Sequence, residues 1–179
     1  MPRKTQPKKT EHARRRVRYA VATSLDGFIA GPHGEYDWIV MDPEIDFNAI
    51  YSQFDTIVMG RRSYEAAKVA SGVSSKRGTQ VFVCSRTLRQ EDHPSVTIVD
   101  DPVGLMEELR SKPGKDVWLW GGGSLFRSFA ELGLVDTVEV AVVPVLLGEG
   151  VPLLPPPAMR VRLTANRASL MPKQRHLDR

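Results

Sequence analysis

The sequence predicts a single α/β domain built on a mostly parallel central sheet with helices on both faces. From residue 17 onward, short β-rich apolar runs alternate with segments whose apolar residues recur at helical spacing. The length of 179 residues is enough for one sizeable core and too short for two typical domains. Hydrophobic residues make up 41% and charged residues 26%, which are ordinary values for a water-soluble globular protein. Because no apolar run approaches the roughly 20 residues that cross a bilayer, no membrane partner is expected.

The first half of the domain begins with a predicted strand over residues 17–24. It continues into residues 25–31, where Asp26-Gly27 permits a turn or a bulge. Residues 46–54 are predicted to form a helix, because their apolar positions follow helical spacing and Pro43 precedes them. The next elements are a buried strand over residues 55–60, a short helix over 63–69 and a loop over 70–78.

The second half repeats the same alternation of strands and helices. It contains predicted strands over residues 81–84, 95–99 and 117–120 and predicted helices over 102–111 and 124–132. Residues 135–144 are the longest β-rich run, with Val138, Val140 and Val142 on one face. Strands and helices that alternate at this length favour a mostly parallel sheet, and ligands of such sheets bind beyond the carboxyl ends of the strands.

A turn of three glycines follows the predicted strand over residues 117–120. Gly121, Gly122 and Gly123 separate this strand from a helix that opens with Ser124 and Leu125. Such a turn lets backbone N–H groups and the positive end of the helix dipole approach an anion. It predicts a phosphate-holding turn, and the alternative is a turn with a structural role alone. Gly60 ends another strand, so two loops are expected to converge on one site.

Charge is distributed unevenly along the chain. Residues 1–18 hold eight Lys or Arg against one acid, a balance of +7, so the remainder carries −3 of the net +4. We therefore predict a basic disordered tail over residues 1–16, a domain over 17–167 and a polar tail over 168–179. The N-terminal segment lacks the apolar region of a secretory signal, and the single cysteine, Cys84, lies in an apolar run. Both observations favour a cytoplasmic protein.

Four motifs, in order, resemble the dihydrofolate reductase-like superfamily. They are Ser-Leu-Asp-Gly-Phe-Ile-Ala over residues 24–30, Val-Met-Gly-Arg-Arg-Ser-Tyr-Glu over 58–65, Gly-Gly-Gly-Ser over 121–124 and Val-Pro-Val-Leu-Leu-Gly-Glu-Gly-Val-Pro-Leu over 143–153. The resemblance covers roughly residues 17–165 and is strongest to the C-terminal reductase domain of the riboflavin-biosynthesis deaminase-reductases. The zinc-deaminase signature is absent from the sequence. Residues 168–179 are polar where the family has a final strand, so a truncated antiparallel edge is expected.

The resemblance implies an NADPH cofactor and a set of residues that hold it. A 2′-phosphate requires guanidinium and hydroxyl donors, which Arg61, Ser63, Ser85 and Arg86 supply. The alternative is that Arg61 and Arg86 are solubility charges. The resemblance implies that Ala22 and Ile29 flank the nicotinamide, and plain core packing is the alternative for both. The implied cofactor-binding residues are Ala22, Ile29, Gly60, Arg61, Arg62, Ser63, Ser85, Arg86, Gly121, Gly122, Gly123, Ser124 and Leu125.

Two aspartates are candidates for the proton-handling catalytic residue. Reduction of a C=N bond needs a proton for nitrogen, and the resemblance implies an acid at the start of the helix over residues 46–54. Asp46 fits this role best among Asp42, Glu44 and Asp46, although a plain N-cap aspartate would look the same. Asp26 is the second candidate, with a turn aspartate as its alternative. Trp38 either forms a wall of the substrate pocket or packs without contacting substrate.

The sequence thus predicts an NADPH-dependent reductase of a small planar heterocyclic or imine-like substrate, either pterin- or folate-like or a riboflavin-precursor pyrimidine. One alternative is an NADPH-binding protein without turnover. Another is a protein that associates with nucleic acid through the basic N-terminal tail, which lacks interleaved aromatic residues. No metal site is predicted. The resemblance and the valine stripe over residues 138–142 predict a homodimer.

Overall fold

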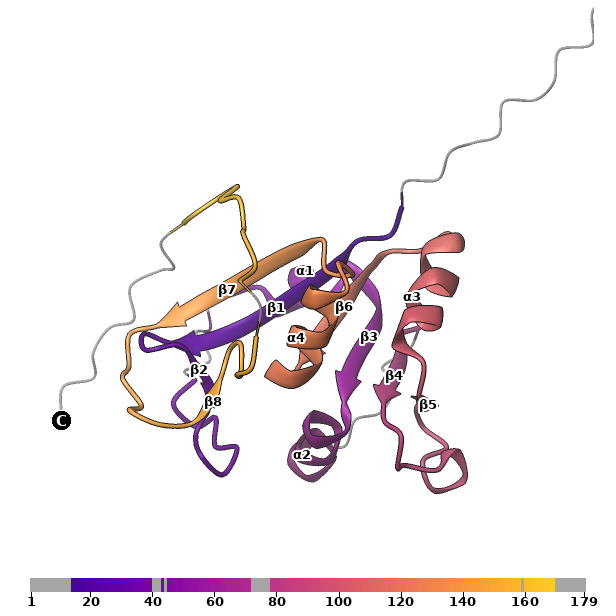
Figure 1. Cartoon of the computed structure of the whole chain (residues 1–179), viewed down its shortest axis with the longest axis horizontal. Helices are drawn as coiled ribbons and strands as arrows, with labels where there is room; N and C mark the ends of the chain where they lie inside the picture. The colour runs from indigo at the N-terminus through magenta and orange to yellow at the C-terminus, as the bar shows by residue number, and fades with distance from the viewer. Residues whose placement is uncertain (1–13, 40–42, 44, 72–77, 159, 170–179) are drawn as a thin grey trace, which may run out of the picture.

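The computed structural model describes residues 14–39, 43, 45–71, 78–158 and 160–169. Its core is a six-stranded sheet with the order β5-β4-β3-β6-β1-β7, in which all neighbouring strands are parallel (Figure 1). These strands are β1 (Val17–Ser24), β3 (Phe54–Gly60), β4 (Gln80–Cys84), β5 (Thr97–Val99), β6 (Asp116–Gly121) and β7 (Thr137–Val143). A separate antiparallel pair joins β2 (Phe28–Ala30) to β8 (Val151–Pro152).

Helices cover both faces of the sheet, as the alternating pattern predicts. They are α1 (Phe47–Tyr51), α2 (Arg61–Ser71), α3 (Pro102–Ser111) and α4 (Gly123–Glu131), with a short 3₁₀ turn over Gln90–Asp92. The helices α3 and α4 pack on one face, where Leu105, Met106 and Phe129 join the main core. On the other face, α1 contacts β6, and α2 packs Tyr64 into a second core cluster.

The strand β6 shows how side-chain alternation divides the two faces. Val117 and Leu119 are fully buried in the core beneath α3 and α4. Trp118 and Trp120 point to the opposite face, because successive residues of a strand alternate. The valine stripe predicted for β7 alternates in the same way, since Val140 lies beside Val21 of β1 and Ala141 lies beside Ala22.

Several predicted boundaries differ from the structure for identifiable reasons. The predicted helix over residues 46–54 ends at Tyr51, because Phe54 begins β3 and pairs with Asp116 of β6. Sheet pairing overrides the helical spacing of Phe54. The helix α2 starts at Arg61, directly after β3, and extends to Ser71, which shortens the predicted loop. Residues 72–77 of that loop lie outside the described residues.

The structure describes part of each predicted tail, residues 14–16 at the N-terminal end and 168–169 at the C-terminal end. Arg15, which the sequence assigns to a basic tail, is instead buried, donates to the Lys115 carbonyl at 2.7 Å and pairs with Asp55. Residues 1–13 and 170–179 lie outside the described residues, so the tails there remain predictions. In the described part of the chain, β7 pairs with β1 alone, and residues 160–169 are exposed and form no strand. Within the same residues, no helix is long and apolar enough to cross a membrane.

Candidate functional site

Two loops meet at the carboxyl ends of the neighbouring strands β3 and β6. Met59 of β3 is in register with Gly121 of β6. A Cβ atom added at Gly60 would lie 3.8 Å from the Gly121 carbonyl oxygen, and one added at Gly122 would lie 3.3 Å from Ser63 Oγ. The predicted convergence of the glycine turn and the loop after Gly60 is therefore present in the structure.

Two helices begin where these loops meet. The helix α2 starts directly after Gly60, and α4 starts at Gly123 with Gly122 as its N-cap. Glycine has no side chain, so Gly122 makes no side-chain hydrogen bond to the first turn of α4. The first-turn N–H groups of a helix have no partner within the helix and carry the positive end of its dipole. The site therefore has the chemistry that favours a bound anion.

The three glycines of the turn have different surroundings. Gly121 has a φ of +119°, a conformation that favours glycine. A Cβ atom at Gly123 would lie 2.6 Å from the Pro152 carbonyl oxygen and 2.8 Å from Pro155 Cδ, so this residue packs against the segment after β8. Gly122 instead borders Ser63 across the junction of the two loops. Of the three, Gly122 is best placed to face a ligand.

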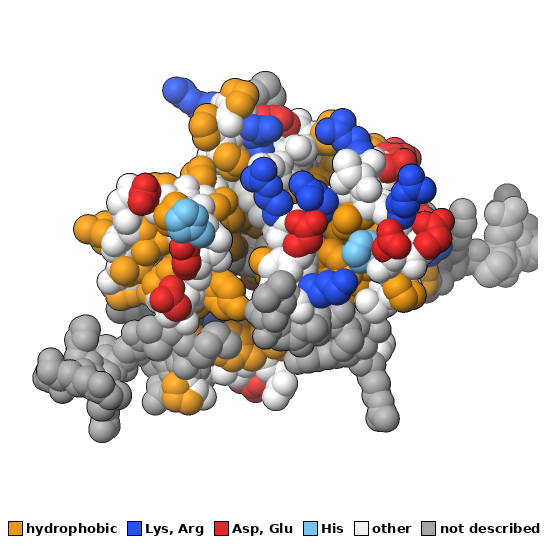
Figure 2. All heavy atoms as spheres, turned by 90° about the horizontal axis from the view of Figure 1, so that it is seen from below, with side chains coloured by type: hydrophobic (Ala, Val, Ile, Leu, Met, Phe, Trp, Pro, Cys, Tyr) orange, Lys and Arg blue, Asp and Glu red, His pale blue; other side chains and the backbone are white. Residues whose placement is uncertain are grey.

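The predicted phosphate-binding arginines are exposed and differ in their partners. Arg61 forms an i,i+4 ion pair with Glu65 at 3.2 Å. Arg62 and Arg86 form no hydrogen bond or ion pair within the described part of the chain. Lys and Arg side chains gather on the side of the molecule that carries α2 and β4, next to acidic side chains (Figure 2). Arg62 and Arg86 therefore offer guanidinium groups that are not committed to a carboxylate.

Ser85 shapes the loop after β4. Its Oγ accepts hydrogen bonds from the backbone N–H groups of Thr87, at 3.2 Å, and Leu88, at 3.1 Å. Its own N–H donates to the Val99 carbonyl at 2.9 Å. The backbone N–H of Ser85 is thus committed to the sheet. A ligand would meet only its hydroxyl group, so the predicted phosphate contact of Ser85 depends on that hydroxyl alone.

The residues predicted to flank a nicotinamide lie at the carboxyl end of β1 and in β2. Ala22 is half-buried on the face opposite α3 and α4, beside Ala141. Two hydrogen bonds attach β2 to the end of β1: Thr23 Oγ1 donates to the Phe28 carbonyl at 3.1 Å, and the Phe28 N–H donates to Ser24 Oγ at 2.9 Å. Ile29, the next residue of β2, is also half-buried.

Asp26 links the turn after β1 to the loop that precedes β8. Its carboxylate accepts hydrogen bonds from the Ser24 hydroxyl at 2.6 Å, the Gly148 N–H at 2.7 Å and the Leu147 N–H at 3.1 Å. The Ser24 bond, followed by the backbone bonds, lowers the pKa of Asp26 from its ordinary value of 3.8. These contacts hold the carboxylate in its ionised form.

Asp46 occupies the N-cap position of the five-residue helix α1. Its Oδ1 accepts a hydrogen bond from the Ala49 N–H at 2.9 Å, and its side chain is exposed. Asp42 and Glu44, the other acids of this region, lie outside the described residues. Trp38 is half-buried and donates from Nε1 to the Glu35 carbonyl at 3.2 Å.

Trp120, an exposed aromatic residue at the end of β6, is not among the site residues predicted from the sequence. Its side chain is 39% exposed and stacks on Trp118, with ring centroids 5.4 Å apart and planes within 10°. Trp118 in turn stacks on Tyr51 of α1, also at 5.4 Å. The sequence carries the signal, because alternation along residues 117–120 places both tryptophans on one face, directly before the glycine turn.

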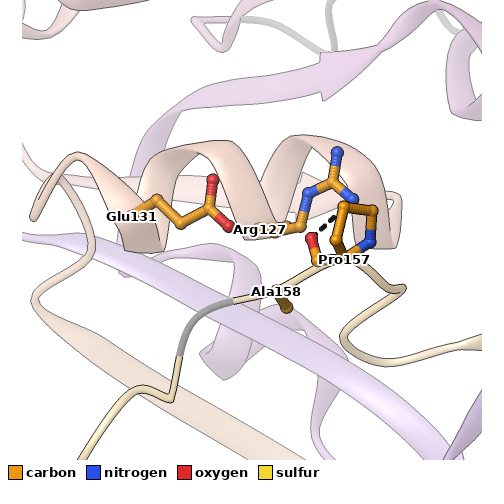
Figure 3. Close-up of a pocket in the computed structure, with 4 residues that line it drawn as sticks. All are labelled: Arg127, Glu131, Pro157 and Ala158. Carbon is orange, nitrogen blue, oxygen red and sulfur yellow. Dashed lines mark hydrogen bonds between the residues drawn. The ribbon is translucent and has the colours of Figure 1, made fainter.

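A pocket of about 360 Å³ lies beside the carboxyl-terminal half of α4, away from the glycine turn (Figure 3). It is lined by Arg127, Glu131, Pro157 and Ala158. Arg127 Nη1 donates to the carbonyls of Pro156 and Pro157, both at 3.0 Å. Arg127 thus attaches the proline segment to α4, and none of the predicted site residues lines this pocket.

Comparison with known proteins places the fold and the family. The protein YyaP of Bacillus subtilis is 37% identical over 163 residues, which cover 83% of this chain and 85% of that protein. A solved structure from Shewanella sp. PV-4, titled as a putative riboflavin biosynthesis protein, has a TM-score of 0.67 and 29% identity. The match covers 78% of this chain and 83% of the Shewanella chain.

Two more distant structures show the fold alone. The deaminase and 5-amino-6-(5-phosphoribosylamino)uracil reductase of Thermotoga maritima has a TM-score of 0.55 at 19% identity, over 78% of this chain and 48% of that one. A dihydrofolate reductase from Enterococcus faecalis, solved with NADP(H), has a TM-score of 0.58 at 17% identity. The match covers 78% of this chain and 77% of that reductase. The fold is therefore one that reductases use. The family model of the RibD C-terminal domain matches residues 15–177. The chain belongs to the RibD C-terminal domain family.

Proposed function

We propose that the protein is an NADPH-dependent reductase of a small planar heterocyclic substrate. The observation that carries the proposal is the meeting of two helix N-termini at the glycine turn, with Gly122 facing Ser63. The unpaired guanidinium groups of Arg62 and Arg86 add positive charge on the side of α2 and β4. Membership of a family whose fold is used by reductases supports the same activity.

The residues at this junction fit the phosphates of a nicotinamide dinucleotide. A Cβ atom at Gly122 would fill the space in front of Ser63 Oγ, so glycine keeps the backbone open to a pyrophosphate there. Arg62, Arg86 and Ser63 would hold the 2′-phosphate through charge-assisted hydrogen bonds. When bound, the cofactor supplies the hydride. Ala22 and Ile29 would give its nicotinamide an apolar wall that excludes water.

The two candidate aspartates receive different roles in this proposal. Asp26 accepts hydrogen bonds from three different residues and is held ionised, so it positions the loop over residues 146–148. Only Oδ1 of Asp46 accepts a hydrogen bond, from the Ala49 N–H, so the other oxygen of this exposed side chain is available to relay a proton from water to the substrate nitrogen. Asp46 is therefore the proposed proton donor, and Asp26 is a positioning residue.

The test is cofactor binding followed by turnover with purified full-length protein. Titration calorimetry measures the affinity for NADPH and NADH, and the absorbance of NADPH follows its oxidation with dihydropterins, dihydrofolate and aminouracils. We expect NADPH to bind more tightly than NADH and at least one planar substrate to be reduced. Failure of NADPH to bind would refute the proposal. Tight binding without oxidation of NADPH by any member of the panel would instead support the cofactor-binding alternative.

A further inference from the structure

Lys and Arg residues are absent from the two stretches of sequence that contain the residues proposed to contact the nicotinamide and the substrate. None occurs over residues 19–60 or over residues 128–159, whereas 11 occur over residues 61–127. The two stretches contain 7 and 4 acidic residues, respectively. They include most of β1 and all of β2, α1, β3, β7 and β8, the elements that carry Ala22, Ile29 and Asp46. Asp55, Asp136 and Glu139 among these acids are paired with arginines at the other end of the sheet, and Asp42 and Glu44 lie outside the described residues. The exposed acids that remain in these elements and their loops are Asp26, Glu35, Asp37, Asp46 and Glu149, and no Lys or Arg lies in the same stretches.

The described basic residues that precede residue 19 are Arg14, Arg15, Arg16 and Arg18, which lie at the other end of the sheet and are all paired with acids. Arg18 contacts Glu139 at 2.7 Å and Asp116 at 3.3 Å, and Arg16 contacts Asp116 at 2.6 Å. Asp116 lies five residues before Gly121 in β6, about 16 Å along a strand. The remaining basic residues follow residue 159, and the described ones among them lie in the exposed C-terminal segment.

The surface shows Lys and Arg side chains mixed with acidic ones on one side and acidic side chains on the other (Figure 2). In Figure 2, Lys and Arg side chains gather on the side of α2 and β4, and the lobe at the left, where β2 and β8 lie, shows acidic side chains and a histidine. Charges of one sign along a site raise the local concentration of ligands of opposite sign and lower that of ligands of the same sign. The cofactor side favours phosphates, and the substrate side disfavours them.

Trp120 provides an uncharged contact surface within this region. Its indole ring is 39% exposed at the carboxyl end of β6, directly before Gly121. It is backed by Trp118, which is itself held by a hydrogen bond from its Nε1 to the Ala20 carbonyl at 3.1 Å. An indole ring fixed in this way offers a flat surface on which a planar heterocycle can stack.

We propose that the substrate is a planar heterocycle without phosphate or carboxylate groups, neutral or cationic, and that its ring stacks on Trp120. The inference rests on the proposed function and narrows its substrate class. Stacking supplies affinity that does not depend on charge, and the acidic residues on this side penalise an anionic substituent. A phosphorylated ribosylaminopyrimidine and a glutamate-bearing folate are both disfavoured on this basis.

The test compares pairs of substrates that share a ring and differ in charge. The first pair is dihydrobiopterin and dihydrofolate, and the second is a ribosylaminouracil and its phosphate ester. We expect kcat/KM to favour the uncharged member by about tenfold at low ionic strength. Added salt is expected to reduce this difference in kcat/KM between the uncharged and anionic substrates, because it screens the repulsion between exposed charges. Equal or better use of the anionic members would overturn the inference.

Variants at Trp120 test the stacking surface. We expect Trp120→Ala to raise KM for the preferred substrate about tenfold or more, and Trp120→Phe to stay within about threefold of the unmodified protein. Circular dichroism and the affinity for NADPH check that each variant is folded and keeps its cofactor site. An unchanged KM in a folded Trp120→Ala variant would overturn the role of Trp120.

The cofactor measurement separates the two proposals. If NADPH does not bind, the proposed function itself fails. If NADPH binds and is oxidised with the anionic substrates at least as efficiently as with the neutral ones, the reductase assignment stands and the substrate class inferred here is wrong.

Discussion

At the scale of single residues, the arginines differ in how far their charge is already committed. Arg61 is paired with Glu65, while Arg62 and Arg86 have no partner among the described residues. The resemblance implies that all three arginines hold the cofactor. Only the structure shows which of them already has an acidic partner. An arginine on the first turn of a helix can form an ion pair with an acid four residues later. Whether it does so depends on side-chain rotamers, which the sequence does not fix.

We predict that Arg62→Ala combined with Arg86→Ala removes most of the preference for NADPH over NADH. Each charge-assisted hydrogen bond contributes about 1.5–3 kcal/mol, so a loss of at least tenfold is expected. Fluorescence titration with both cofactors measures the preference. Lys112→Ala is the matched control, because Lys112 pairs with Glu108 on α3. Retention of the full preference in the double variant would show that other groups read the 2′-phosphate.

At the scale of elements, the sequence predicts β6, α4 and the turn between them nearly to the residue. Apolar alternation, three glycines and a helical pattern follow one another there without ambiguity. The helix α1 was predicted too long, because Phe54 satisfies both the helical spacing and the pairing of β3. The different roles of Gly122 and Gly123 could not be predicted, since they depend on Ser63 and Pro152, which are distant in sequence.

We predict opposite phenotypes for substitutions at adjacent glycines of this turn. Gly122→Val places its side chain at the junction with Ser63 and is expected to abolish NADPH binding in a folded protein. Gly123→Ala places Cβ 2.6 Å from the Pro152 carbonyl oxygen, so overpacking of about 1–3 kcal/mol is expected. This lowers Tm by several degrees. Thermal melts and NADPH titration check both. A folded Gly122→Val variant with normal NADPH affinity would show that the turn is structural.

We predict that Asp26→Asn loosens the loop over residues 146–148 in a pH-dependent way. The pKa of Asp26 is lowered in the folded protein by bonds from Ser24, Gly148 and Leu147, so the ionised form stabilises the fold. That contribution is full above the ordinary value of 3.8 and is lost as the pH falls through the lower folded pKa. Thermal melts should therefore separate variant and unmodified protein at pH 7 and converge in acid.

A matched variant controls this pH experiment. Asp37→Asn changes an exposed aspartate of the following loop for which the described residues show no hydrogen bond, and it should leave Tm unchanged at either pH. A Tm difference for Asp26→Asn that is the same at neutral and acidic pH would show that the carboxylate charge does not clamp the loop.

At the scale of the whole molecule, the order of strands and helices predicts the α/β class and the parallel sheet. The sequence also predicts an open edge after β7, and in the described residues β7 has β1 as its single neighbour. The exposed valines of this edge, Val140 at 38% and Val142 at 55%, stand beside unpaired backbone groups. This edge is therefore the place where a second chain would pair.

We predict a homodimer in which this edge of β7 is covered. Light scattering should give twice the mass of one chain, and Val142→Lys should shift the protein toward monomer, because a buried charge without a partner is costly. Leu132→Lys is the matched control, since Leu132 is equally exposed at 55% but lies at the end of α4. A stable monomer for the unmodified protein would contradict the prediction.

The position of β1 between β6 and β7 also sets the order of events during synthesis of the chain. Val17 pairs with Val117, and Arg18 pairs with Thr137, so β1 leaves the ribosome some 100 residues before the two strands that flank it. At about 5–20 residues per second, this delay lasts roughly 5–20 s. During it, the side chains of Val17 and Tyr19, which are fully buried in the folded protein, stay exposed to chaperones. A nascent chain released before β6 is made would lack the partner that buries Val17 and Tyr19.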